Sequence, residues 1–167
     1  MQSVTAYFSP RGNCAVAVVN AINAATTTLD VAIFSLTHDD ITNALIAAHQ
    51  RGVKMRAVMD ADEAKGVYSD HTKLSDAGID VRIDTMAGLM HDKIAIVDAG
   101  LSTAALATGS FNWTRSADRD NAENLLIITL PDIIAQYATQ YEALWALNDP
   151  ARVVAKKSKK QVSPVKP

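Results

Sequence analysis

The chain has 167 residues, a length that fits one domain with room for an apolar core. Hydrophobic residues make up 49% and charged residues 20%, with seven glycines and five prolines, which excludes collagen-like, low-complexity and disordered classes for most of the chain. The single cysteine, Cys14, excludes an intramolecular disulfide framework and a multi-cysteine zinc site. No apolar run approaches the roughly 20 residues that span a bilayer, so we expect no membrane span.

The charges are distributed unevenly along the chain. Residues 151–167 hold six of the 16 basic residues and no acid, which leaves ten basic against 18 acidic residues in 1–150. We therefore predict one acidic domain over residues 1–150 and a basic, disordered tail over 151–167, whose lysines are either solvated or a tether for polyanions. Because nucleic-acid binders usually present a basic face, the acidic domain disfavours tight binding of a duplex by a broad surface.

Hydrophobic periodicity and glycine punctuation predict alternating strands and helices. In chain order we expect a strand at 4–8, a helix at 13–25, a strand at 29–35, a helix at 37–51, a strand at 53–59, a short helix closed by Gly78, a strand at 79–83, further strands at 93–97, 104–108 and 124–128, and a helix at 131–147. This order predicts an α/β fold with a mixed, mostly parallel β-sheet sandwiched between helices.

Polar residues stand at the ends of three of the predicted strands. His91 and Lys93 are two residues apart at a strand start, so they share a face, which places a nucleophile or base beside a positive charge. Ser110 and Asn112 follow the next strand with one parity, and Glu123 opens the last strand. A capping histidine and a snorkelling lysine would explain the first pair alone. Three such clusters on neighbouring strands are typical of a site at a sheet edge.

Together these segments resemble the signature of the phospholipase D superfamily. The pattern is His91-x-Lys93, then Asp98 after four more residues, then Gly109-Ser110-x-Asn112 and Glu123-Asn124. The single copy of the motif, with Gly-Ser-Phe-Asn-Trp-Thr and Ala-Glu-Asn-Leu-Leu, is most similar to the small bacterial endonucleases of that family. The match covers roughly residues 28 to 130. The gap before Gly109 is longer than the usual spacing, which predicts a longer turn around residues 98–104.

The resemblance implies phosphodiester cleavage without a metal or another cofactor. His91 would attack phosphorus to form a phosphohistidine intermediate, while Lys93, Ser110 and Asn112 would bind the phosphoryl oxygens. By resemblance, Glu123 would accept the other ring N–H of His91 and fix its tautomer.

Three further charged residues lie in or near the motif but are not assigned to the attack on phosphorus. Asp98 belongs to the signature but lies on the opposite strand face from Lys93, so we expect it to fix the backbone of the motif. Arg115 and Arg119 fall on the loop between the motifs, where they either meet neighbouring phosphates of the substrate or are exposed solubilising charges.

The mechanism needs two histidines, one to attack and one to protonate the leaving group, but the chain has one motif. The other histidines, His38, His49 and His71, have no matching lysine and are expected at the surface. A C₂ homodimer with two copies of His91 around one phosphate would complete the site.

We therefore expect a metal-independent endonuclease that cleaves DNA without sequence preference, with RNA left open as a second substrate. One alternative is a phospholipase D-like lipid phosphodiesterase, which would need an apolar platform for acyl chains. Another is a non-catalytic nucleic-acid-binding module, against which the intact His91, Lys93, Asn112 and Glu123 argue. The resemblance also implies a periplasmic or secreted protein whose leader has been removed, with the cytoplasm as the alternative.

Overall fold

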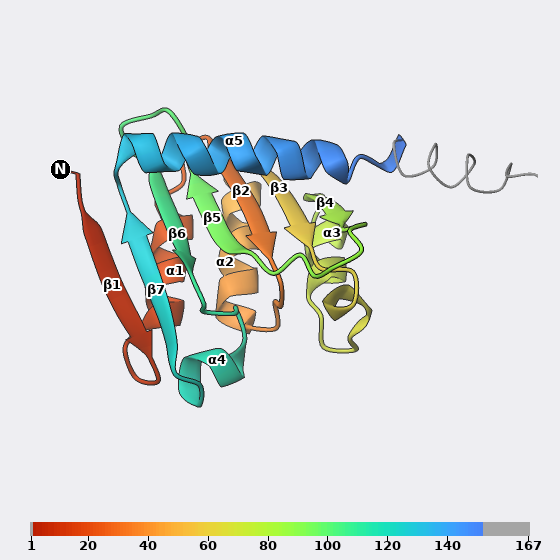
Figure 1. The fold of residues 1–167 in the computed structure, drawn as a ribbon, viewed down its shortest axis with the longest axis horizontal. Coiled ribbons are helices and arrows are strands. Elements are labelled where there is room, and N and C mark those ends of the chain that lie inside the picture. The colour runs from red at the N-terminus through yellow and green to blue at the C-terminus, as the bar shows by residue number, and fades with distance from the viewer. Residues whose placement is uncertain (1, 152–167) are drawn as a thin grey trace, which may run out of the picture.

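The computed structural model describes residues 2–151, in which helices and strands alternate along the first half of the chain (Figure 1). The elements are β1 (Val4–Ser9), α1 (Cys14–Asn23), β2 (Thr28–Ile33), α2 (Asp39–Gln50), β3 (Lys54–Met59), the 3₁₀ helix η1 (Glu63–Lys65), α3 (His71–Asp76), β4 (Asp80–Ile83), β5 (Lys93–Val97), β6 (Ala105–Gly109), α4 (Arg115–Arg119), β7 (Glu123–Ile128) and α5 (Pro131–Leu147). None of the described helices is both long and apolar enough to cross a membrane. The predicted basic tail lies, beyond Ala151, outside the described residues.

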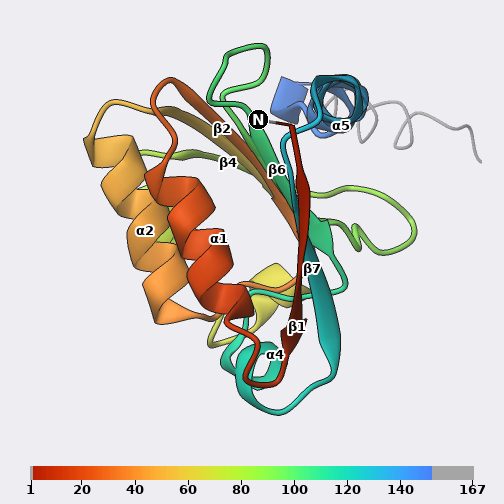
Figure 2. The ribbon, with the colours of Figure 1, turned by 90° about the vertical axis from the view of Figure 1, so that its left-hand side faces the viewer.

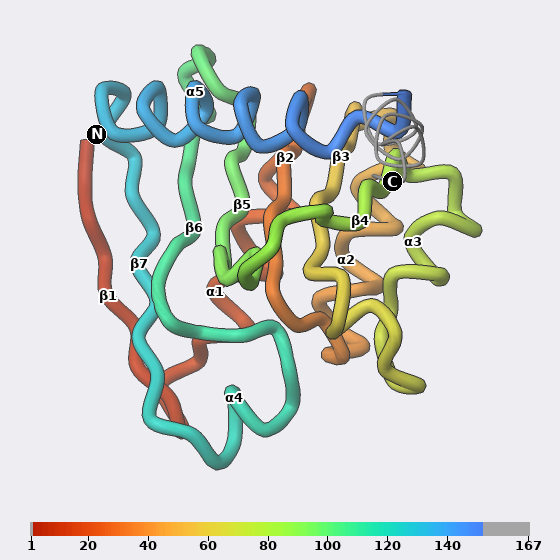
Figure 3. Tube along the Cα trace, turned by 45° about the vertical axis from the view of Figure 1, so that its right-hand side comes forward, coloured from red at the N-terminus to blue at the C-terminus, as the bar shows by residue number. Residues whose placement is uncertain are grey.

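All seven strands form one sheet with the order β1-β7-β6-β5-β2-β3-β4 (Figure 3). The mixed sheet between helices is confirmed, but the expectation of mostly parallel pairing is wrong. Of the six neighbouring pairs, β2–β3 and β3–β4 are parallel and the other four are antiparallel. The reason is that the long crossover helices of a parallel sheet stop after β4, and shorter connections link β5, β6 and β7.

The two faces of the sheet are covered by different helices (Figure 2). Helices α1 and α2 cover one face, where Leu29, Val31 and Ile33 of β2 enter the larger core cluster. Helix α5 lies on the other face, where Ala32 of β2 belongs to a smaller cluster. Side chains that alternate along a strand therefore enter two separate cores, and β5 is buried at all five positions, with Lys93 followed by four apolar residues.

Helix α5 is fastened to the sheet by the guanidinium of Arg56 on β3. This group donates to Asp30 at 2.7 Å and to Glu142 of α5 at 2.6 Å. It also lies 5.2 Å from the ring centre of Tyr141 and 5.3 Å from that of Trp145, within cation–π range. Figure 1 shows α5 crossing the ends of the strands where β5 finishes, so the opposite end of this face has no helix over it.

The strand that carries the motif is tied to β2 by the buried carboxylate of Asp98. Its Oδ1 accepts the backbone N–H groups of Thr27 and Thr28 at 2.7 and 2.9 Å. Its Oδ2 accepts the N–H and hydroxyl of Thr26 at 2.9 and 2.7 Å and the hydroxyl of Thr103 at 2.8 Å. Burial opposes ionisation, but these hydrogen bonds outweigh it and lower the pKa of Asp98 to about 2. The expected role of Asp98 in fixing the motif backbone agrees with these contacts.

We predict that Asp98→Asn lowers the free energy of unfolding at pH 7 by about 2 kcal/mol, because the ionised carboxylate is stabilised only in the folded state. The wild-type protein should lose this contribution as pH falls from about 4 through 2, where the folded carboxylate becomes protonated. Urea unfolding at several pH values measures both effects. Asp76→Asn, at an exposed position on α3, is the matched control. Parallel pH–stability curves for wild type and Asp98→Asn would contradict this account.

Candidate active site

The ends of four strands bring the predicted site residues to one edge of the sheet. Strand β5 pairs antiparallel with both β2 and β6, and β6 pairs antiparallel with β7. The starts of β5 and β7 therefore meet the ends of β2 and β6. His91 and Lys93 lie at the start of β5, Ser110 and Asn112 follow β6, and Glu123 is the first residue of β7. Asp98, at the far end of β5, lies away from this edge.

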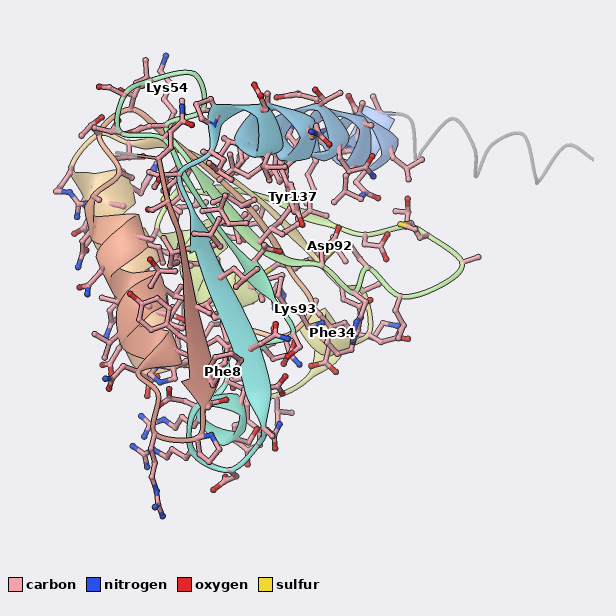
Figure 4. All side chains as sticks on the ribbon, turned by 60° about the vertical axis from the view of Figure 1, so that its left-hand side comes forward. Phe8, Phe34, Lys54, Asp92, Lys93 and Tyr137 are labelled. Atoms are coloured by element: carbon pink, nitrogen blue, oxygen red, sulfur yellow. The ribbon has the colours of Figure 1, made fainter. Side chains whose placement is uncertain are left out.

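Phe34, the residue after β2, contacts both polar side chains of the motif (Figure 4). Its ring centre lies 4.6 Å from that of His91, with the planes tilted by 56°, and 4.7 Å from the Lys93 ammonium. The ammonium also donates to the His91 carbonyl oxygen at 2.7 Å. His91 is exposed at the edge, whereas Lys93 is only 5% exposed.

Lys93 is a buried cation surrounded by carboxylates without a direct ion pair among the described residues. Burial lowers the pKa of its ammonium below the ordinary lysine value, and the carboxylates of Asp92, Glu123, Glu63 and Asp60, which raise it, do not compensate. A partly desolvated ammonium gains more from a bound anion than a solvated one does. The position is therefore suited to binding a phosphate oxygen.

The polar groups of β6 and β7 form a hydrogen-bonded cluster beside this lysine. Ser110 Oγ donates to Glu123 Oε2 at 2.6 Å and accepts the N–H of Asn124 at 3.0 Å. A Cβ at Gly109 would lie 2.3 Å from the carbonyl oxygen of Asn124, so this approach requires glycine.

The predicted hydrogen bond from His91 to Glu123 is absent from the described chain. The Glu123 carboxylate is instead occupied by Ser110 and by the side-chain amide of Asn121, which donates to Oε1 at 3.3 Å. Since Ser110 follows β6, the strand that pairs with β7, its hydroxyl reaches Glu123 directly.

Asn112 is held near the end of β2 by its neighbour Trp113. The Trp113 N–H donates to Ser35 at 3.1 Å, and the Trp113 carbonyl accepts the N–H groups of Thr37 and His38. The Oδ1 of Asn112 is buried and has no hydrogen-bond partner in the described chain. An unpaired buried acceptor costs about 1–3 kcal/mol, which a ligand or a second protein surface can recover.

Two expectations for the residues around this edge need correction. Arg115 and Arg119 lie on α4 rather than on a loop, because Thr114 caps that helix by accepting the N–H of Ala117. Arg115 is paired with Asp39 at the start of α2. His38 is only 8% exposed rather than at the surface, since its backbone pairs with Trp113.

Phe34 was missed by the sequence reasoning. The signal that could have drawn attention to it is an aromatic residue at the end of an apolar strand, but this pattern also fits an ordinary core residue.

Comparisons with known proteins agree with the fold and with the family that the sequence resembles. The model of the cardiolipin synthase, PLD-like domain matches residues 18–145. The mitochondrial cardiolipin hydrolase of Chlamydomonas reinhardtii is 42% identical over 74% of this chain and 54% of its own length, and the phospholipase D of Rickettsia prowazekii is 38% identical over 75% and 60%. The structure of Nuc from Salmonella typhimurium, a phospholipase D family member, superposes with a TM-score of 0.81 and 33% identity, covering 88% of this chain and 96% of that one. NucT from Helicobacter pylori has the same fold at 22% identity, with a TM-score of 0.80, over 87% of this chain and 97% of that one.

The chain therefore belongs to the phospholipase D superfamily, whose members are phosphodiesterase hydrolases. Within it, the chain is similar over almost the full length to the small protein Nuc, whereas it spans only 54 to 60% of the two curated relatives above.

We predict that Lys93→Met reduces phosphodiester hydrolysis at least about 100-fold, because it removes the cation placed to bind the phosphoryl oxygen. The variant should unfold no more easily than wild type at pH 7, since methionine fills the alkyl volume without burying an ammonium. Any stability advantage should shrink as pH rises from the lowered pKa of Lys93 towards 10.5, where the cost of burying the charge disappears. Activity assays and thermal melts measure these effects. Lys54→Met, at an exposed position that starts β3, should change neither.

Proposed function

We propose that this protein is an endonuclease that hydrolyses phosphodiester bonds in DNA, and in RNA as well, without a bound metal. The observation that carries the proposal is the exposed His91 imidazole beside the buried Lys93 ammonium at one sheet edge. The near-complete coverage of the small protein Nuc supports a nuclease over the longer lipid-cleaving relatives.

The proposed reaction proceeds in two steps at phosphorus. A ring nitrogen of neutral His91 attacks phosphorus, the bond to the leaving oxygen breaks, and that oxygen takes a proton from a second acid. The conjugate base of that acid then takes a proton from water, which attacks phosphorus; the P–N bond breaks, and the phosphate monoester and the free imidazole are released. Lys93 and the side-chain amide of Asn112 stabilise the charge on the phosphoryl oxygens in both steps. The Ser110 hydroxyl, which donates to Glu123, holds that carboxylate beside them.

We propose a homodimer that places two copies of this edge around one phosphate. The reaction needs a second acid for the leaving oxygen, which a second His91 would supply. The buried Asn112 Oδ1 also has no hydrogen-bond partner among the described residues. The neighbouring sheet face is also partly uncovered, because Phe8 of β1, opposite Asn124 of β7, is 62% exposed. A second copy would supply the other histidine, a second lysine and a cover for this face.

The shared site predicts a nonlinear loss of activity when subunits are mixed. Random exchange in an equal mixture of wild type and His91→Ala leaves about one quarter of the dimers with two intact histidines. We therefore expect nicking of plasmid DNA at about one quarter of the wild-type rate. Independent sites would retain half. Sedimentation that shows an active monomer would also exclude the shared site.

A second candidate function, hydrolysis of phospholipids, is favoured by a groove beside His91. This groove of about 630 Å³ lies between the loop before β5 and helix α5. Six of its nine lining residues are apolar, and His91, Asp92 and Gln140 are the polar ones; the lining residues are Met86, Leu89, Met90, His91, Asp92, Gln140, Ala143, Leu144 and Leu147. The groove is formed by a loop and α5 together. Its apolar residues next to His91 would suit an acyl chain joined to a phosphate at that histidine.

Parallel assays on plasmid DNA and on phosphatidylglycerol vesicles, both in excess EDTA, distinguish the two candidates. We expect DNA nicking to survive EDTA, because the site presents a lysine and the described residues contain no cluster of three potential metal ligands. His91→Ala should reduce nicking at least about 1,000-fold, as expected for loss of a nucleophile.

The groove provides a matched pair of variants for the same assays. Leu89, 56% exposed, lines the groove, whereas Leu101, 48% exposed, lies on the β5–β6 turn at the other end of the strand. We expect Leu89→Gln and Leu101→Gln to nick DNA equally well. Vesicle hydrolysis that falls in Leu89→Gln alone, together with an absence of nicking, would identify a lipid substrate. Nicking that disappears in EDTA and returns with Mg²⁺ would contradict the metal-independent mechanism.

A further inference from the structure

The phenyl ring of Phe34 lies against both side chains to which the reaction has been assigned. Its centre is 4.6 Å from the His91 ring centre and 4.7 Å from the Lys93 ammonium nitrogen. Figure 4 shows Phe34 and Lys93 next to each other at the uncovered end of the sheet. Among the described residues, no other side chain makes a ring contact, hydrogen bond or ion pair with the His91 imidazole or the Lys93 ammonium.

The backbone fixes this ring relative to the motif. The N–H of Phe34 donates to the carbonyl oxygen of Asp92, between the two motif residues, at 2.9 Å. Ile33, the preceding residue, pairs with Lys93 in the β2–β5 register. The ring is therefore attached, through main-chain hydrogen bonds, to the same segment whose side chains it touches, and it is half-buried there.

The two contacts have different physical effects. The face of an aromatic ring carries negative electrostatic potential and attracts an ammonium group, most strongly where water is partly excluded. A tilted aromatic contact restricts the rotation of the exposed imidazole, which otherwise has no hydrogen bond to orient it in the described chain. One side chain thus restrains both the nucleophile and the cation before any substrate is present.

We propose that Phe34 is a positioning residue, whose ring holds the His91 imidazole and the Lys93 ammonium in the mutual geometry needed to engage one phosphate. This role rests on the proposed phosphodiesterase reaction. With this role, the residue that follows β2 contributes to the catalytic arrangement, although it does not belong to the sequence signature. The role requires an aromatic ring at this position, whereas a purely structural role would require only apolar volume.

Three variants test this requirement. Phe34→Leu keeps apolar volume without the ring, Phe34→Tyr keeps the ring, and Leu29→Ala weakens the same strand at a fully buried position away from the site. On a small chromogenic phosphodiester, we expect Phe34→Leu to lower kcat about 10- to 100-fold with little change in KM, as for a misplaced reacting group. Phe34→Tyr should restore kcat to near the wild-type value. Leu29→Ala should lower Tm and leave kcat unchanged below the unfolding transition.

The ring contact also has a spectroscopic signature that does not depend on turnover. The ring protons of His91 should be shielded by Phe34 in the wild type, and their NMR signals should move towards the free-histidine position in Phe34→Leu but not in Leu29→Ala. Equal kcat losses in Phe34→Leu and Phe34→Tyr, or unchanged His91 signals in Phe34→Leu, would overturn the positioning role. If the wild type cleaves no phosphodiester, both the proposed function and the role of Phe34 in catalysis are wrong. The NMR comparison then still shows whether the Phe34 ring orders His91.

Discussion

The register between β2 and β5 is the constraint on which the geometry of the site depends. At one end, the Asp98 carboxylate accepts hydrogen bonds from the chain that enters β2. At the other end, the Phe34 N–H donates to Asp92. With both ends of β5 tied to β2, a slip of one residue would turn every side chain of β5 to the opposite core and remove Lys93 from the edge. The signature aspartate therefore fixes the end of β5 that lies away from the site, through hydrogen bonds to the residues that enter β2.

The charge distribution sets a second constraint. Lys93 is partly desolvated and lies among carboxylates, and residues 1–150 are acidic overall. A polyanion therefore gains little from the general surface and must obtain most of its binding free energy from a few groups at the edge. A two-fold axis through this edge would bring two copies of His91 and Lys93 to one phosphate, together with two copies of the surrounding carboxylates.

The sequence predicted the order and type of the main elements and the edge at which the polar residues meet, because periodicity and strand ends are local properties. It did not predict the direction of pairing, since β2 and β5 are neighbours only through contacts between residues distant in the chain. The same limit explains why the contacts of Phe34 with the motif and the burial of His38 were not predicted. Their surroundings come from other segments, and nothing in their own neighbours distinguishes a core residue from one that contacts the motif. The donors to the Glu123 carboxylate depend on the position of Ser110, which a spacing pattern does not specify.

Different residues of α5 attach the helix to the sheet and border the groove. The groove residues of α5 would affect substrate binding, whereas the reacting side chains lie on the sheet. The helix is fastened by the contacts of Arg56 with Tyr141, Glu142 and Trp145, while different residues, Gln140, Ala143 and Leu147, border the groove. The exposed groove positions Gln140 and Ala143 take no part in this attachment, whereas Leu144, which also lines the groove, belongs to the core cluster beneath α5. Related proteins could therefore differ in ligand preference through substitutions at a few positions of α5. Such substitutions would cost little stability and would leave the catalytic residues unchanged.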